Sequence, residues 1–467
     1  MTVRTDVARA LDGRMLRLWN QVSPRKRAMR LADWLLPRSV RRPTFLVVCA
    51  ALFVAATFFD WVSLLPFRLL DNPATILGLL LAFGYVGLRA RYAPFFRMPA
   101  SLALLYLGAT IVSVVVGGEG FEPGWGTREL PFYFQFFQAG ILFLIFVDVL
   151  RDRRAVVGVV VVFFVACTAM SVLAHLGFDP NVGGGRSYVR VGVKGLNLNE
   201  QALRYGLCLL GVFGWSVLRW PRFRLREWVL LACSASMLVA LVRTGSRGGL
   251  AMLLFGLVLG TLLLLRRARA LAYVTLVPVL IASVAYTIFS SPLVRQRIAE
   301  VERGRTGLRV ELTQSSWEMF KQKPVFGWGT RYVEELGGFV GVERRIAAHN
   351  TYMQILLSFG LVGFIPWLLL VGVPGWWLWR WRRHPIVTMV LVVYASALLF
   401  ALAGNQGYDK VFWILVAFAA VTPALVGAPV ATPARARVDA FASPRSRRGG
   451  QLPSPVSTSG YYRAPRV

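Results

Sequence analysis

The chain has 467 residues, of which 56% are hydrophobic, and a mean hydropathy of +0.57. This composition excludes an ordinary soluble protein of this size, and repeated uncharged runs separated by Arg clusters predict an all-α polytopic membrane protein. The formal net charge of +31 does not indicate a nucleic-acid partner, because the basic residues stand between hydrophobic runs, where topology and anionic membrane lipids explain them.

Residues 1–43 form a basic segment with eleven Lys and Arg residues against three acidic residues. Leu11, Met15, Leu18, Trp19 and Val22 recur at roughly helical spacing. The pattern predicts an amphipathic cytoplasmic segment that lies on an anionic membrane surface, and a solvated basic tail is the alternative.

Twelve hydrophobic segments follow, and together they predict a transmembrane domain over residues 44–428. An even number of spans leaves both termini on one side of the membrane. About two-thirds of the 53 Lys and Arg residues lie on that side, so the positive-inside rule predicts that it is the cytoplasm. The predicted spans are approximately 44–60, 73–88, 99–117, 132–150, 155–175, 200–218, 228–243, 248–265, 270–290, 351–379, 385–403 and 411–428.

The longest polar stretch inside this domain, residues 291–350, separates spans nine and ten. It holds ten basic and seven acidic residues, so it is expected to be a large, partly helical, folded loop on the external side. Residues 429–467 are rich in Pro, Ser and Arg, and they are expected to form a disordered basic cytoplasmic tail.

His349 is the histidine whose context most suggests chemistry, because it stands where the polar loop becomes a long apolar helix. Asn350 or Thr351 is expected to cap that helix. The helix dipole disfavours a protonated imidazole there, so a neutral His349 could act as a general base. A capping or interfacial histidine without a catalytic role is the alternative.

A second candidate is the turn Arg243-Thr244-Gly245-Ser246-Arg247-Gly248-Gly249 between spans seven and eight. The seventh span has about 15 apolar residues, which gives only about 23 Å of helix, so the turn is expected to lie below the outer membrane surface. Arg247 at that depth is a candidate anion ligand, with nearby glycines that let backbone amides approach phosphate. A tight turn with snorkelling arginines explains the same pattern.

The stretch 183–200 sets Arg186 and Arg190 among glycines and ends in Asn197 and Asn199 at a helix start. These side chains offer charged and neutral donors to a phosphorylated sugar. A glycine-rich loop with ordinary caps is the alternative. Arg309 is a further candidate, in a segment, 308–320, with enough apolar positions for a short helix over the bundle.

Residues 185–370 resemble the O-antigen ligase and polymerase family of bacterial envelope glycan enzymes. The motifs that carry the resemblance are Arg190 with Asn197-Leu198-Asn199-Glu200-Gln201-Ala202, then Ser246-Arg247-Gly248, Arg309 upstream of Trp317, Pro324-Val325-Phe326-Gly327-Trp328-Gly329, and His349-Asn350 followed by Gly360 and Gly363. Leu198 departs from the family's usual proline, which is expected to alter only the local turn.

The resemblance implies transfer of a glycan from undecaprenyl diphosphate to an acceptor hydroxyl at the periplasmic face of the bacterial inner membrane, with a lipid A-core acceptor as in a ligase. It implies that His349 is the base and that Arg190, Arg247 and Arg309 hold the diphosphate. Arg186, Arg243, Asn197, Asn199 and Tyr352 are additional candidate substrate contacts. No cofactor is expected, and an arginine clamp is preferred to a metal because the external carboxylates lack ligand spacing.

Other functions remain open at this point. A polymerase would use a second lipid-linked repeat unit as the glycan acceptor, and an oligosaccharyltransferase would use a protein side chain. A lipid-linked glycan transporter also fits twelve spans, but transporters usually show midplane charges and two similar halves. A metal-dependent sugar transferase would differ from the arginine-clamp enzyme in its sensitivity to a chelator.

Overall fold

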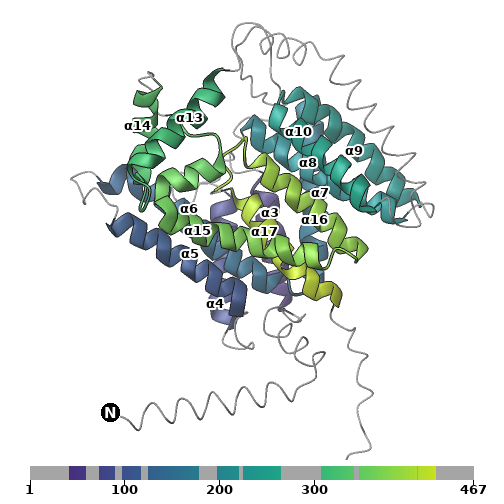
Figure 1. The fold of residues 1–467 in the computed structure, drawn as a ribbon. Coiled ribbons are helices and arrows are strands. Elements are labelled where there is room, and N and C mark those ends of the chain that lie inside the picture. The colour runs from purple at the N-terminus through teal and green to yellow at the C-terminus, as the bar shows by residue number, and fades with distance from the viewer. Residues whose placement is uncertain are drawn as a thin grey trace, which may run out of the picture. The chain divides into compact units, whose positions relative to one another are not determined.

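The computed structural model describes residues 42–58, 73–89, 97–116, 125–177, 197–219, 224–264, 307–340, 346–407 and 409–427. These residues form helices, and none of them lies in a strand (Figure 1). In chain order the helices are α3 (Thr44–Ala56), α4 (Pro73–Arg89), α5 (Arg97–Val116), α6 (Trp125–Val149), α7 (Arg153–His175), α8 (Leu198–Arg219), α9 (Leu225–Arg243), α10 (Arg247–Leu264), α13 (Gly307–Gln322), the 3₁₀ turn η1 (Gly329–Arg331), α14 (Tyr332–Phe339), α15 (Thr351–Arg380), α16 (Pro385–Phe400) and α17 (Lys410–Gly427).

The predicted all-helical membrane architecture is confirmed, although the count of twelve spans is not. Within the described residues, five helices are long and apolar enough to cross a membrane: α5, α7, α8, α9 and α15. Helices α3, α4, α6, α10, α16 and α17 contain shorter apolar stretches of 10–17 residues. The predicted ninth span, residues 1–41 and the predicted tail lie outside the described residues.

The interior is built from two groups of helices that share a seam. One core joins α3 to α6 with α15, α16 and α17, and its largest buried side chains include Trp367 and Trp413. A second core lies between α7, α8, α9 and α10. A smaller cluster on α8, α10, α16 and α17 joins them, with Leu203, Met252 and Phe400 at its centre. The two groups are therefore tied together by apolar contacts.

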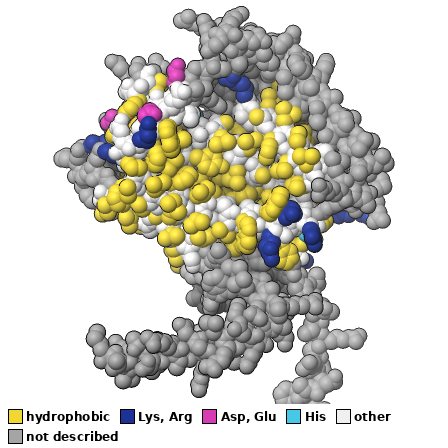
Figure 2. All heavy atoms as spheres, viewed as in Figure 1, with side chains coloured by type: hydrophobic (Ala, Val, Ile, Leu, Met, Phe, Trp, Pro, Cys, Tyr) yellow, Lys and Arg dark blue, Asp and Glu magenta, His cyan; other side chains and the backbone are white. Residues whose placement is uncertain are grey.

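The outside of these helices is hydrophobic, as lipid contact requires. Along α7 the exposed side chains Val157, Val160, Val161 and Val165 recur at the helical spacing of three and four residues. Figure 2 shows a broad face of hydrophobic side chains, with Lys and Arg side chains at its margins. Such a continuous apolar surface would be a liability in water and is expected for a membrane protein.

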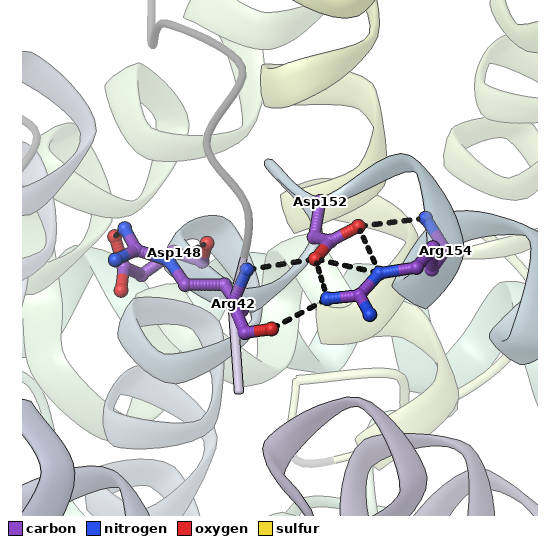
Figure 3. A network of polar contacts seen from close by, with 4 residues as sticks. All are labelled: Arg42, Asp148, Asp152 and Arg154. Atoms are coloured by element: carbon purple, nitrogen blue, oxygen red, sulfur yellow. Dashed lines mark hydrogen bonds and ion pairs between the residues drawn. The ribbon is translucent and has the colours of Figure 1, made fainter. Parts of the chain in front are cut away.

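One end of the bundle is closed by a network of ion pairs and hydrogen bonds (Figure 3). Arg42 pairs with Asp148 at 2.5 Å, and its backbone amide donates to the Asp152 carboxylate at 2.7 Å. Asp152 also caps α7 and accepts from the Arg154 side chain. Burial alone would raise the pKa of Asp152, but the hydrogen bonds from the Arg154 side chain and the Arg42 amide outweigh it and lower the pKa below its usual range. The charged carboxylate therefore fastens the start of α3 to the α6–α7 turn.

Candidate active site

The other end of the bundle is where the candidate site residues come together. The end of α7, the start of α8, the end of α9, the start of α10, the start of α15 and the end of α16 are linked there by hydrogen bonds and close packing. At the opposite end, Arg380 ends α15 and is followed by Arg382 and Arg383, while Arg219 ends α8 and Arg224 precedes α9. Within the described residues, the candidate site and these arginines therefore lie at opposite ends of the helices.

Helix α15 is broken at Gly360, and the break receives the loop that precedes η1. Gly360 has φ 58° and ψ −161°, a conformation open essentially to glycine alone. The amides of Leu361 and Val362 donate to the carbonyls of Pro324 and Val325 at 2.8 and 3.1 Å. The loop therefore supplies acceptors for amides that a continuous helix would have paired internally.

At this break the backbone of the 324–328 loop packs directly against the backbone of α15. A Cβ on Gly360 would lie 2.3 Å from the Val325 carbonyl oxygen, and one on Gly327 would lie 2.6 Å from the Leu357 carbonyl oxygen. Trp328 N donates to that Leu357 carbonyl at 2.6 Å, while Ser113 of α5 donates to the Phe359 carbonyl at 2.6 Å. The Pro324–Gly329 motif and Gly360 are thus two halves of one docking contact.

This contact holds the folded part of the predicted loop against α15. Leu312 and Met319 of α13 and Leu336 of α14 form one apolar cluster with Ala348 and Leu357. Trp328 Nε1 donates to the Met319 carbonyl at 2.8 Å, and Figure 1 shows α13 and α14 beside α15. The helix predicted at 308–320 is therefore present as α13. Ala348, immediately before His349, is buried in this cluster and anchors the histidine's backbone.

His349 is exposed and has φ 50°, the one non-glycine residue with a positive φ among the described residues. The left-handed conformation costs an ordinary residue about 1–2 kcal/mol, and such strain concentrates at functional sites. Asn350 caps α15, as predicted, because its side chain accepts from the amides of Tyr352 and Met353 at 3.0 and 3.3 Å. The cap directs the chain so that the imidazole stands at the head of the helix.

Thr351 fastens this helix start to the turn at residues 401–406. Its amide donates to the Ala401 carbonyl at 2.8 Å, and its hydroxyl donates to the Gly404 carbonyl at 2.6 Å. The same hydroxyl accepts from the amide of Gln406 at 2.7 Å. The backbone around His349 is therefore held in place by three elements: the loop before it, the start of α15 and the turn after α16.

Arg247 belongs to a neighbouring turn that packs on the same 401–406 segment. Gly245 has φ 63°, and Ser246 precedes α10 with its hydroxyl accepting from the Gly249 amide at 3.3 Å. A Cβ on Gly248 would lie 3.0 Å from Ala403 Cβ, so the two turns are in contact. Arg247 is the first residue of α10 and is exposed. The head of α10 and the head of α15, each with a candidate residue, therefore flank one turn.

The helix before this turn is longer than predicted. Helix α9 runs from Leu225 to Arg243, so it begins three residues before the predicted start at 228. Nineteen residues span about 28 Å, close to the thickness of a bilayer's hydrocarbon core. The helix starts early because the Glu227 carboxylate accepts from the Arg224 backbone amide at 2.8 Å, which satisfies a free amide at the helix start. Arg247 is therefore a candidate by exposure and position, not by membrane depth.

Arg243, at the end of α9, is held by a histidine. His175 Nε2 lies 3.0 Å from the Ser236 carbonyl oxygen, and Arg243 Nη1 lies 3.3 Å from His175 Nδ1. A carbonyl oxygen can only accept, so Nε2 carries the proton and Nδ1 accepts from the guanidinium. His175 thus orients Arg243 at the same end of the bundle as Arg247.

The remaining candidates divide into three kinds. Asn197 is exposed and caps α8, because its Oδ1 accepts from the Asn199 amide at 2.9 Å. The Tyr352 hydroxyl donates to the Leu398 carbonyl at 3.1 Å, a structural role that leaves less reason to expect substrate contact. Arg309 lies in the first turn of α13 but its side chain is outside the described part of the chain, as are Arg186 and Arg190. Of the three arginines predicted to hold the diphosphate, Arg247 is the one whose side chain the structure describes.

A buried ion pair that was not predicted from the sequence lies beneath this end of the bundle. Arg204 of α8 and Asp409 before α17 approach to 3.7 Å, and both side chains are 5% exposed. Arg204 also donates to the Thr57 carbonyl at 2.9 Å and lies over the Phe58 ring, while Asp409 caps α17 through the Phe412 amide. A charged residue inside an apolar span was the available signal.

We expect Arg204→Met to lower the stability of the protein by about 3–5 kcal/mol, because it leaves the Asp409 carboxylate buried and unpaired. The double variant Arg204→Met/Asp409→Asn should recover most of this loss, since Asn keeps the helix cap without the charge. Thermal unfolding in detergent measures both. Lys321→Gln, which breaks the exposed pair with Glu318, is the control and should change stability little. Wild-type stability of Arg204→Met would show that the pair is not structural.

Comparison with protein families gives a match over part of the chain. Residues 232–368 match the family model described as O-Antigen ligase. No curated protein matches the chain. The matched segment runs from α9 into α15 and includes Arg243, Arg247, Arg309 and His349, whereas Arg190 and Asn197 lie before it.

The match agrees with the motifs that carry the resemblance from Ser246 to Gly363.

In the described residues no group of three or more His, Cys, Asp and Glu side chains could hold a metal ion. The long apolar helices indicate a membrane protein, and its residues 232–368 are similar to the O-antigen ligase family.

Proposed function

We propose that this protein transfers a glycan from undecaprenyl diphosphate to an acceptor hydroxyl, with the lipid A-core as acceptor, at the periplasmic face of the bacterial inner membrane. The observation that carries the proposal is the strained, exposed His349 at the head of α15, held beside the turn that also contacts the Arg247 segment. The family match supports transfer chemistry of the ligase or polymerase kind.

The proposed reaction is a direct displacement with inversion at the anomeric carbon. The acceptor oxygen forms a bond to that carbon while the bond from the carbon to the diphosphate oxygen breaks. His349 takes the acceptor's proton, and the leaving diphosphate keeps the electron pair of the broken bond. The displacement therefore requires a base on one side of the sugar ring and cationic groups around the leaving diphosphate on the other side.

Arg247 and the head of α10 suit the leaving group. Aligned backbone amides make the start of an 18-residue helix favourable for an anion, and the exposed guanidinium adds charge-assisted hydrogen bonds. Arg243 stands at the adjacent end of α9, and we propose Arg190 and Arg309 as the other members of the clamp. The proposal uses no metal, because these groups can neutralise the developing charge of the diphosphate.

We expect Arg247→Gln to lower kcat/KM for the lipid-linked donor about 10- to 100-fold, the effect of losing one or two charge-assisted hydrogen bonds to phosphate. Arg247→Lys should recover only part of this, because an ammonium cannot bind bidentately. Arg380→Gln, at the opposite end of the bundle, is the matched control and should stay within about twofold. Unchanged kinetics in Arg247→Gln would mean that Arg247 only ends a turn at the membrane surface.

The assay that tests the function uses purified protein in liposomes with an undecaprenyl-diphosphate-linked oligosaccharide. Product formed with lipid A-core supports the ligase. Product formed only with a second lipid-linked repeat unit would instead support the polymerase, and movement of the lipid-linked glycan across the bilayer without any product would support a transporter.

A further inference from the structure

Three carboxamide side chains gather around the turn at residues 401–407, and the proposed reaction does not yet use them. Gln354 lies on α15 one helical turn after Asn350, and its side chain is directed at the turn, because a Cβ on Gly407 would lie 3.2 Å from Gln354 Oε1. Asn405 and Gln406 belong to the turn itself. Gln354 is 1% exposed and Gln406 is 2% exposed.

These amides carry polar atoms that the described protein atoms do not pair. Both side-chain polar atoms of Gln354, together with Gln406 Oε1 and Asn405 Oδ1, have no hydrogen-bond partner among the described residues. Buried polar atoms are nearly always paired, because leaving them unpaired costs free energy. A group of unpaired amide atoms in one place therefore indicates that something else supplies their partners.

The chemistry of the cluster indicates what that partner is. A carboxamide donates and accepts at once and carries no charge, so it matches a hydroxyl group better than a phosphate. The backbone amide of Gln406 donates to the Thr351 hydroxyl, so the turn that carries the cluster is bonded to the start of α15, two residues after His349. Neutral carboxamides therefore lie by the start of α15, whereas the candidate cations Arg243 and Arg247 lie on the neighbouring helix ends.

We infer that Gln354, Asn405 and Gln406 form a subsite that recognises the hydroxyl groups of a sugar ring, so that these amides select the glycan that enters beside His349. The inference rests on the proposed function and deepens it, because the subsite would align the ring whose hydroxyl or anomeric carbon reacts. The unpaired amides lower the stability of the empty protein and are satisfied when the sugar binds.

Gln354→Met and Gln406→Met test the subsite, because methionine keeps the length of the side chain and removes the hydrogen-bonding groups. In liposomes with undecaprenyl-diphosphate-linked oligosaccharide and lipid A-core, each variant should raise the KM of one sugar substrate about three- to tenfold. Each should also raise the unfolding temperature of the substrate-free protein, because a buried unpaired amide is gone. A higher KM for lipid A-core assigns the subsite to the acceptor sugar, and a higher KM for the lipid-linked oligosaccharide assigns it to the donor sugar.

Ser216→Ala is the control. It also removes a buried polar atom without a hydrogen-bond partner, the Ser216 hydroxyl, but at the far end of α8, so both KM values should stay unchanged. Folded Gln354→Met and Gln406→Met proteins with wild-type KM for both substrates would overturn the subsite, whether or not they are more stable. If the wild-type protein transfers no glycan in the same assay, the proposed function fails, and the subsite fails with it.

Discussion

His349→Asn is expected to lower kcat for glycan transfer by about 10²- to 10⁴-fold, the usual effect of removing a general base. Asparagine is the sharpest replacement, because it tolerates the left-handed backbone that His349 adopts at φ 50°. The start of α15 should therefore keep its cap at Asn350 and its bonds from Thr351 to the 401–406 turn. Single-turnover transfer with the lipid-linked donor measures the loss.

The control for this variant is His384→Asn at the opposite end of the bundle, where His384 precedes α16. It should transfer glycan within about twofold of wild type. Unfolding temperatures of both variants should match the wild type. Wild-type kcat in a folded His349→Asn protein would remove His349 from the chemistry and leave it as a residue of the loop.

Gly360→Ala is expected to have the largest effect on stability, a loss of at least about 3 kcal/mol. The backbone conformation of Gly360 is closed to alanine, and the added Cβ would lie 2.3 Å from the Val325 carbonyl oxygen. The docking of the Pro324–Gly329 loop should fail, and with it the support of α13, α14 and His349. The amount of folded protein in membranes and its unfolding temperature in detergent report the loss.

Gly372→Ala is the matched control in the same helix, because nothing lies within 4 Å of the added Cβ. It should leave stability unchanged or raise it by roughly 0.5–1 kcal/mol, as for a glycine in a helix interior. If Gly360→Ala folded as well as Gly372→Ala, the break in α15 would not be the contact that holds the loop.

Much of the helical architecture was predictable because hydrophobic runs and caps are local signals. Except for the segment at 270–290, each predicted span overlaps a described helix. The Asn350 cap and the short helix at 308–320, which the structure shows as α13, were predicted from neighbouring residues. The start of α9 was predicted late, because the charged Arg226 and Glu227 were excluded from a helix whose start the Glu227 carboxylate caps through the Arg224 amide. Boundaries depend on such side-chain to backbone bonds more than on hydrophobicity.

The candidate site was predictable in its residues but not in its contacts. Gly360 and the Pro324–Gly329 motif were recognised separately, yet nothing in the sequence indicates that their backbones bond to one another. The loop between the last two predicted spans was expected, but the role of its polar residues was missed, because Asn405, Gln406 and Asp409 have no motif of their own. Their importance arises from partners far along the chain, Thr351 and Arg204, which only the packing of the helices brings near.

Transfer by the purified protein tests the central claim most directly. Protein in liposomes is offered undecaprenyl-diphosphate-linked oligosaccharide with lipid A-core or with a second lipid-linked repeat unit, each with and without EDTA, and the products are separated by mass. The account predicts transfer to lipid A-core that EDTA does not change and that His349→Asn slows by at least about 100-fold. No transfer to either acceptor, or transfer that EDTA stops, would contradict it.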